Sequence, residues 1–221
     1  MVSDKEIKGE EKIYLAQPPE RKSLPLSERE LVRRAKEGDE KAFTELIQRY
    51  EKRIYNLAFR MLQNSEDAAD VLQETFLRAF RHLKKFKEKS SFYTWLYRIA
   101  LNVSLRKLRK RTKEERRISI DTIGEGRIAA RAEGSNGGEI PDYEFSLEAE
   151  VKRQKVIETV RNALAEIPPE WRSVVILRDM EGLSNEEVAE VLKISVPAVK
   201  SRLHRGRVLL RNILAEKLAK V

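Results

Sequence analysis

Residues 89–113 combine side chains that could hold nucleobases with side chains that could hold phosphates. Aromatic rings come first, at Phe92, Tyr93, Trp95 and Tyr97. A block of cations follows at Arg106, Lys107, Arg109, Lys110 and Arg111, and no acidic residue occurs from Lys89 to Lys113. An exposed ring can stack on an unpaired base for about 1–3 kcal/mol, while neighbouring cations bind the backbone. We therefore expect exposed rings that hold melted or single-stranded DNA beside duplex. Packing in a helical core is the alternative, since Trp95, Ile99 and Val103 lie at helical spacing.

A second nucleic-acid signal lies in residues 183–207, whose pattern is typical of a helix-turn-helix. Ser184 and Glu187 predict a capping box at the start of the first helix. A turn is expected at 193–195, and Pro197 is tolerated in the first turn of the second helix. The second helix has an outward face that is basic from end to end, which favours phosphate and base-edge contacts in a major groove. A solvated basic hairpin is the alternative.

The helix expected at about 65–83 has two faces. One is an apolar stripe, and the other is an acidic surface with residues spaced by three and four. The acidic surface consists of Glu66, Asp67, Asp70, Gln73 and Glu74. The residues alone favour a merely solvated face.

The composition narrows the class of protein. The chain has 221 residues and a formal net charge of +9, which favours an anionic partner such as nucleic acid. It has no cysteine, which excludes disulfides and cysteine-ligated zinc or iron–sulfur clusters. We find no signal peptide and no apolar run of membrane-spanning length, so a cytoplasmic protein is expected. With only His82 and His204 and no phosphate-binding loop, we expect no enzyme activity, no cofactor and no metal.

The helical periodicity divides the chain into two all-α domains. Residues 1–25 are polar and predict a flexible arm. Residues 26–116 form the first domain, in which Ser27 and Glu30 fit another capping box. Residues 117–147 are rich in glycine and predict a flexible linker. Residues 148–221 form the second domain, which contains the helix-turn-helix.

With these motifs in place, the chain resembles the extracytoplasmic-function sigma factors, the smallest class of the sigma-70 family of bacterial RNA polymerase. Four segments carry the resemblance in the family's order. Residues 35–50 resemble the opening helix of the second sigma domain, and 66–80 the polymerase-binding helix. Residues 90–102 resemble the segment that melts and reads the minus-ten element, and 167–207 the fourth sigma domain, which binds the minus-35 element. The third sigma domain has no counterpart here.

The resemblance implies three sets of contact residues. Core polymerase would bind Asp67, Asp70, Gln73 and Glu74. The minus-ten element would be melted and bound by Phe92, Tyr93, Trp95, Tyr97, Arg98, Asn102, Arg106, Lys107, Arg109 and Lys110, with a base flipped into a pocket near Lys89–Ser91. The minus-35 element would be bound by Ser195, Pro197, Ala198, Lys200, Ser201, Arg202, His204, Arg205 and Arg207.

These features predict an alternative sigma factor that binds core RNA polymerase and directs promoter recognition, melting and initiation. The resemblance also implies an anti-sigma protein that packs between the two domains. Two alternatives stay open at this point. The chain could be a stand-alone regulator that uses only its helix-turn-helix, or an RNA-binding protein that uses the aromatic segment.

Overall fold

The computed structural model describes residues 27–121 and 147–218, and it describes side chains within 27–114 and 153–217. The N-terminal half consists of α1 (Glu28–Glu37), α2 (Glu40–Leu62), α3 (Ser65–His82), the short 3₁₀ turn η1 (Leu83–Lys85) and α4 (Phe92–Asp121). The C-terminal half consists of α5 (Leu147–Glu166), α6 (Pro169–Val175), its π-helical continuation η2 (Ile176–Met180), α7 (Asn185–Leu192) and α8 (Val196–Leu218). The predicted all-α fold is confirmed, and no strand occurs in these two ranges.

Capping side chains set the helix starts. Asp39 accepts hydrogen bonds from the backbone of Lys41 and Ala42 at the start of α2, and Asn64 accepts one from Asp67 at the start of α3. Each such cap stabilises a helix by about 1 kcal/mol. The predicted capping box of Ser184 and Glu187 is complete. The box expected at Ser27 is only half present, because the Glu30 carboxylate bonds Arg33 and Arg34 instead.

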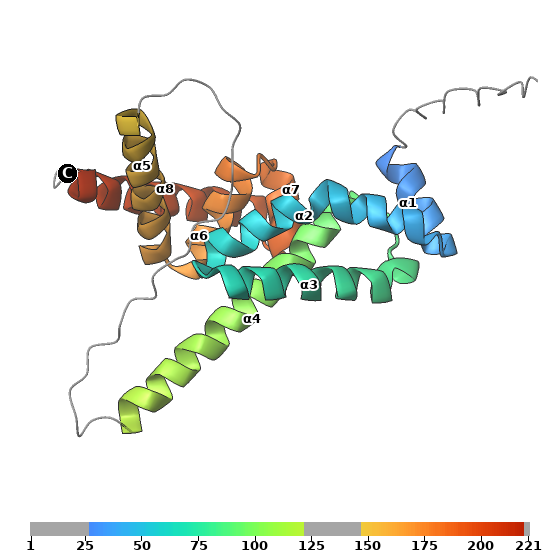
Figure 1. The fold of residues 1–221 in the computed structure, drawn as a ribbon, viewed down its shortest axis with the longest axis horizontal. Coiled ribbons are helices and arrows are strands. Elements are labelled where there is room, and N and C mark those ends of the chain that lie inside the picture. Colours follow the sequence, from blue (N-terminus) through green and yellow to red (C-terminus); the bar gives the residue numbers. More distant parts are fainter. Residues whose placement is uncertain (1–26, 122–146, 219–221) are drawn as a thin grey trace, which may run out of the picture.

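In the N-terminal half, α4 lies across α2 and α3, with α1 at one end (Figure 1). The inward positions of these helices are almost entirely apolar. They include Leu31, Leu46, Ile54, Leu57, Met61, Leu96 and Val103, all with no exposed surface. Helix α4 continues to Asp121, past the point where the linker was expected to begin. The expected arm at 1–25 and residues 122–146 of the expected linker lie outside the described residues.

The C-terminal half packs α5 and α6 on the long helix α8, with α7 completing the helix-turn-helix (Figure 1). Lys193 adopts a left-handed conformation with φ of 55°, which ends α7 and forms the predicted turn. Gly206 permits a close contact between α8 and α6. A Cβ atom at this position would lie 2.7 Å from Val175 Cγ2 and 3.4 Å from Trp171 Cβ. The glycine therefore sets the distance at which α8 packs on α6.

The two helical domains also contact each other directly. Their cores form one continuous apolar cluster, and α7 packs against α4. The buried guanidinium of Arg172 crosses the boundary, with its Nη1 donating to the carbonyl oxygen of Met61 at 2.7 Å and its Nε to that of Ile167 at 3.2 Å. Burial lowers the pKa of Arg172. Among the described residues, no helix is both long and apolar enough to cross a bilayer.

We predict that Gly206→Ala destabilises the fold, although alanine is the better helix former by about 1 kcal/mol. The added methyl collides with the stiff Val175 side chain, and such overpacking costs about 1–3 kcal/mol. Urea unfolding should show a net loss of stability. In a Val175→Ala background the collision partner is smaller, so the same glycine change should cost less. Equal costs in both backgrounds would contradict this packing role.

Candidate nucleic-acid interface

The rings of the aromatic segment fall into two environments. Phe92 and Tyr97 are buried, so the expectation that they are exposed is wrong for this conformation. Phe92 packs within 6.0 Å, between ring centroids, of Tyr50, Phe86 and Trp95. Tyr97 is covered by the C-terminal half of the chain, where its hydroxyl donates to Glu181 at 2.6 Å. Periodicity alone could not reveal this second covering, because Glu181 is far away in the sequence.

The remaining two rings are half-buried. Trp95 stacks obliquely on Phe86, with ring centroids 4.9 Å apart, and keeps part of its surface open. The hydroxyl of Tyr93 donates to Glu187 of α7, and its ring meets Tyr97 edge-on. Burial raises the pKa of Tyr97, and the hydrogen bond to Glu181 raises it further. The hydroxyl of Tyr97 therefore stays protonated at neutral pH and acts as a donor.

The polar positions of α4 are more accessible than its rings. Asn102, Arg109 and Lys110 are exposed. Two of the predicted cations are instead paired with α3. Lys107 bonds Asp67 at 2.6 Å and Asp70 at 2.8 Å, and Arg106 bonds Glu74 at 2.5 Å. Three of the predicted polymerase-binding residues and two of the predicted DNA-binding residues thus neutralise one another between α3 and α4.

These pairs shift the pKa values of Glu74 and Lys107. The hydrogen bond from Arg106 lowers the pKa of Glu74, so this carboxylate stays charged at neutral pH. Burial alone would lower the pKa of Lys107, but the bonds to Asp67 and Asp70 outweigh it and the pKa is raised. Because these side chains are largely exposed, the pairs add little to stability.

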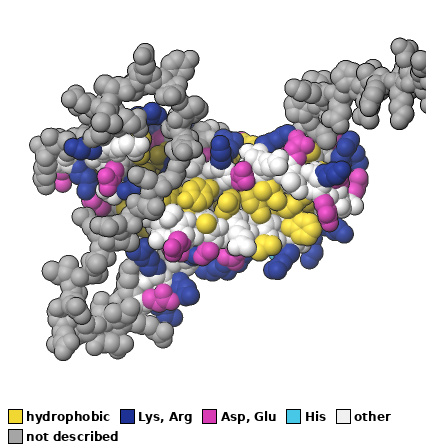
Figure 2. Space-filling view, in the orientation of Figure 1, with side chains coloured by type: hydrophobic (Ala, Val, Ile, Leu, Met, Phe, Trp, Pro, Cys, Tyr) yellow, Lys and Arg dark blue, Asp and Glu magenta, His cyan; other side chains and the backbone are white. Residues whose placement is uncertain are grey.

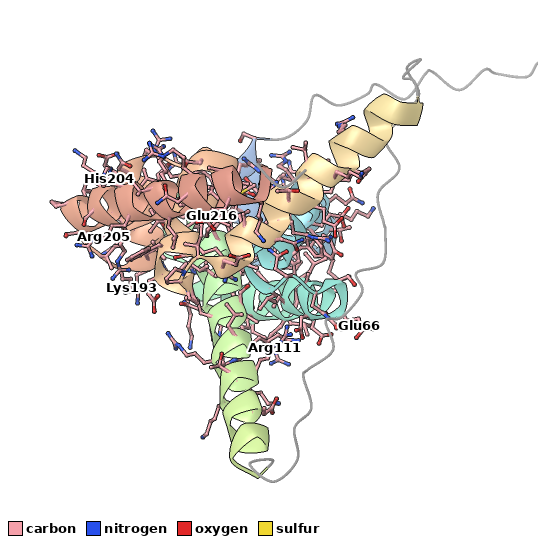
Figure 3. All side chains as sticks on the ribbon, turned by 90° about the vertical axis from the view of Figure 1, so that its left-hand side faces the viewer. Glu66, Arg111, Lys193, His204, Arg205 and Glu216 are labelled. Atoms are coloured by element: carbon pink, nitrogen blue, oxygen red, sulfur yellow. The ribbon has the colours of Figure 1, made fainter. Side chains whose placement is uncertain are left out.

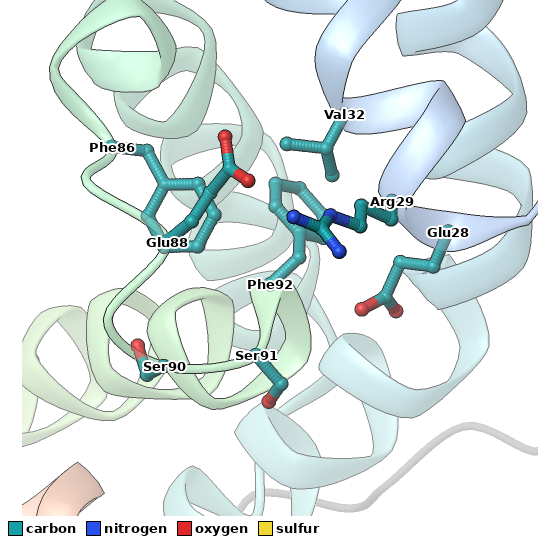
Figure 4. Close-up of a pocket in the computed structure, with 8 residues that line it drawn as sticks. All are labelled: Glu28, Arg29, Val32, Phe86, Glu88, Ser90, Ser91 and Phe92. Carbon is teal, nitrogen blue, oxygen red and sulfur yellow. The ribbon is translucent and has the colours of Figure 1, made fainter.

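A cavity of about 380 Å³ opens beside the start of α4, in the place where the flipped-base pocket was expected. Figure 4 shows Phe86 on one wall, Glu28 and Arg29 of α1 on the other, and Ser90 and Ser91 on the connecting loop. Its volume lies within the roughly 300–1,000 Å³ of typical small-ligand sites. Rings, hydroxyls and carboxylates together provide the stacking surfaces, donors and acceptors that a nucleobase edge requires.

Lys36 fixes the loop of this cavity, and sequence reasoning missed it. Its ammonium group donates to the carbonyl oxygen of Phe86 at 3.0 Å and to the Glu88 carboxylate at 2.7 Å. Glu88 adopts a left-handed conformation with φ of 52°, which turns the chain toward α4. Burial raises the pKa of Glu28 at the cavity wall, whereas the hydrogen bond from Lys36 lowers the pKa of Glu88. In the sequence, Lys36 is only a lysine within an expected helix, and nothing near it indicates a contact with the loop at residues 86–88.

The helix-turn-helix presents its second helix outward. Most of the predicted minus-35 residues are exposed, and Ala198 and Arg202 are half-buried. Figure 3 shows Lys193, His204 and Arg205 along one side of the molecule, with Glu66 on the opposite side. Ser195 caps the helix by accepting from the backbone of Ala198 at 3.4 Å. Arg207 forms an ion pair with Asp179 and donates hydrogen bonds to both of its carboxylate oxygens, at 2.9 and 2.5 Å.

An apolar band also crosses the face formed by α2 and α3, edged by acidic side chains (Figure 2). Leu77 and Phe80 of α3 are exposed by 49% and 57%, unusually high fractions for large apolar residues. Phe80 packs on Phe43 of α2 with ring centroids 5.2 Å apart. Because residues 70, 73, 74, 77 and 81 follow helical spacing, Leu77 extends the acidic surface of α3 and Phe80 lies at its margin. The sequence predicted the acidic residues of this surface but not the exposed apolar residues Leu77 and Phe80.

Both halves of the chain match models of known protein families. Residues 46–114 match the family model described as Sigma-70 region 2, and residues 157–210 match Sigma-70, region 4. The chain is 33% identical to the ECF RNA polymerase sigma factor SigW of Bacillus subtilis, over 84% of this chain and 95% of SigW. It is 35% identical to the ECF RNA polymerase sigma-E factor of Haemophilus influenzae, over 85% of this chain and 95% of that protein.

The fold leads to the same group. A solved structure of CnrH in complex with the cytosolic domain of CnrY matches with a TM-score of 0.60 and 26% identity, covering 86% of this chain and 97% of CnrH. A stand-alone helix-turn-helix regulator is not favoured, because the N-terminal half matches sigma-70 region 2 rather than a sensor or dimerisation domain. The chain belongs to the extracytoplasmic-function sigma factors of the sigma-70 family and is an alternative sigma factor of RNA polymerase.

Proposed function

We propose that the chain binds core RNA polymerase through α3 and uses α4 and α8 to hold the two elements of a promoter. The observation that carries this proposal is the position of the cavity. It opens at the start of α4, and two of its lining rings, Phe86 and Phe92, pack on Trp95. The exposed polar side chains of α4 continue from there along the helix. A strand held by Asn102, Arg109 and Lys110 would place a base within reach of Trp95 and the cavity.

In this proposal the chain does not catalyse melting, but binds bases that have left the duplex. Extruding a base costs a few kcal/mol, and stacking on Trp95 together with polar contacts in the cavity offsets that cost. The Glu28 and Glu88 carboxylates are acceptors of the kind that an exocyclic amino group requires. The polymerase performs the nucleotide chemistry, so we propose no catalytic residue on this chain. The chain would act in the cytoplasm, with the polymerase.

The helix-turn-helix would read duplex DNA with the N-terminal part of α8. Pro197, Lys200 and Ser201 are exposed there and can approach base edges, while His204 and Arg205 lie further along and can meet phosphates. Arg207 is the least available of the predicted contacts because Asp179 holds it. Its first role would be to brace α8 against η2.

An anti-sigma protein is the other partner that we propose, on the basis of the family resemblance. The fold offers a crevice of about 450 Å³ between α4 and the C-terminal helices. Leu105, Leu108 and Leu192 supply apolar surface there, and Arg109 and Arg202 supply cations. An amphipathic partner segment with acidic residues would suit this lining.

The proposed function is tested by run-off transcription with purified core polymerase over a randomised promoter library. We expect initiation from a defined set of promoters, and weak binding of isolated promoter DNA by the chain alone. Failure to associate with core polymerase would contradict the proposal.

We predict that Trp95→Ala impairs promoter opening while leaving duplex binding intact. Loss of one stacking surface removes about 1–3 kcal/mol, so open complexes should fall by roughly fivefold or more. Permanganate reactivity of melted thymines measures opening, and footprinting of the upstream element measures duplex binding. Tyr55→Ala, which removes a half-buried ring of α2 stacked on Phe59, is the matched control. Normal opening by the Trp95 variant would contradict the trapping role.

We predict that Leu77→Ser combined with Phe80→Ser weakens binding to core polymerase. Their exposed surface gives them little role in the core, so folding should be retained, while lost apolar burial should lower affinity by about tenfold or more. Fluorescence anisotropy of the labelled chain, titrated with core polymerase, measures the affinity. Met180→Ser, which removes an apolar side chain with 38% exposure from η2, is the control. Unchanged affinity of the double variant would exclude the apolar band from the contact.

A further inference from the structure

The turn between η1 and α4 contains an uncommon backbone conformation. Glu88 has a φ of 52°, in the left-handed region that residues with a side chain rarely adopt. Such a conformation costs free energy, and it persists only where neighbouring groups hold it in place. Glu88 also helps to line the cavity beside α4 (Figure 4). The contacts that hold this turn therefore bear on the shape of the cavity.

The ammonium group of Lys36 binds the turn at two points. Lys36 lies in the last turn of α1, and its Nζ donates to the carbonyl oxygen of Phe86 at 3.0 Å and to the Glu88 carboxylate at 2.7 Å. One acceptor is backbone and the other is a side chain, and they lie on either side of Lys87. The pair of bonds therefore ties the left-handed turn to α1.

The same turn carries a ring that supports Trp95. Phe86, Phe92 and Trp95 pack on one another with ring centroids 4.9 to 6.0 Å apart. Phe86 and Phe92 are buried, whereas Trp95 keeps part of its surface open. Phe92 is on the same helix as Trp95, so α4 itself holds those two rings together. Phe86 belongs to the turn, so its place against Trp95 depends on the backbone that Lys36 binds.

A surface binds its ligand more tightly when supporting contacts already hold its groups in the binding geometry. We propose that Lys36 is a positioning residue for strand capture, which holds Phe86 against Trp95 and sets the shape of the adjoining cavity. Lys36 acts through Phe86 and Glu88 and does not itself contact DNA. The inference rests on the proposed function, because that function assigns the captured base to Trp95 and the cavity.

Three substitutions test this role. Lys36→Met removes both bonds and keeps a side chain of similar length, so the turn should be ordered in a smaller fraction of molecules. Lys36→Arg retains a cation that can donate to both acceptors, so it should preserve the turn. Lys84→Met is the matched control, because Lys84 is an exposed lysine of η1 close to Phe86 in the sequence and is not the donor in either bond.

One measurement follows strand binding. The chain is assembled with core polymerase, and fluorescence polarisation is recorded with a labelled minus-ten strand from a promoter selected in the run-off experiment. Apparent affinity falls in proportion to the fraction of molecules in the binding-competent state, so we expect Lys36→Met to weaken strand binding about fivefold. Lys36→Arg and Lys84→Met should stay within about twofold of the unmodified chain.

The other measurement follows the ring itself, without DNA. The chain has two tryptophans, so Trp171→Phe in every variant leaves Trp95 as the sole tryptophan. We expect Lys36→Met to move the Trp95 emission to longer wavelength and to increase its quenching by acrylamide, because a ring released from Phe86 gains contact with water. Lys36→Arg and Lys84→Met should leave the emission and the quenching unchanged.

Several results would overturn the positioning role. One is unchanged Trp95 emission and unchanged strand affinity in Lys36→Met. Another is weaker strand binding with unchanged emission, since Lys36 would then act on the strand directly. A third is loss of the helical circular-dichroism signal in Lys36→Met, which would mean that Lys36 holds the whole fold rather than this turn.

Trp95→Ala separates this inference from the proposed function. If Trp95→Ala weakens strand binding and Lys36→Met does not, the positioning role fails and the proposed function stands. If neither substitution weakens it, the proposed function fails, and the Trp95 emission alone decides whether Lys36 holds the ring.

Discussion

Helix α4 must accommodate a long run of cations without an acidic residue of its own from Lys89 to Lys113. The fold supplies the missing negative charge from two directions. Helix α3 contributes Asp67, Asp70 and Glu74 to the middle of α4, and α7 contributes Glu190, which pairs with Arg98 near its beginning. These pairs bring acidic side chains to cations that α4 cannot neutralise by itself, while Arg109 and Lys110 further along the helix stay exposed.

Local signals predicted most of the fold. The start of α7 followed from Ser184 and Glu187, which form the predicted capping box. The turn at Lys193 followed from the loss of apolar period. These features depend on residues within a few positions of one another, and such interactions can be identified from a single sequence.

The candidate site was less predictable because its environment is built from distant segments. Glu181 contacts Tyr97, and Phe86 and Tyr50 pack on Phe92. None of these three partners lies on α4, the helix that carries Tyr97 and Phe92. An aromatic residue at a helix start has the same sequence signature whether it stacks on a base or on another ring. The cavity beside α4 depends on Lys36, whose bond to the Phe86 carbonyl joins α1 to a loop far along the chain. The charge pairing between α3 and α4 was not predicted, because the acidic face of α3 and the cations of α4 were interpreted separately.

The chemistry of the contact between the halves bears on whether it can be reversible. Opening an interface of apolar side chains alone would expose those side chains to water, and water forms no hydrogen bonds with them that could offset the cost. Around Glu181 the groups in contact are hydroxyls, guanidinium groups and carboxylates, and all of them can form hydrogen bonds with water if the contact opens. The apolar continuity between the two cores also opposes separation, so polar contacts around Glu181 and apolar contacts hold the halves together in this structure.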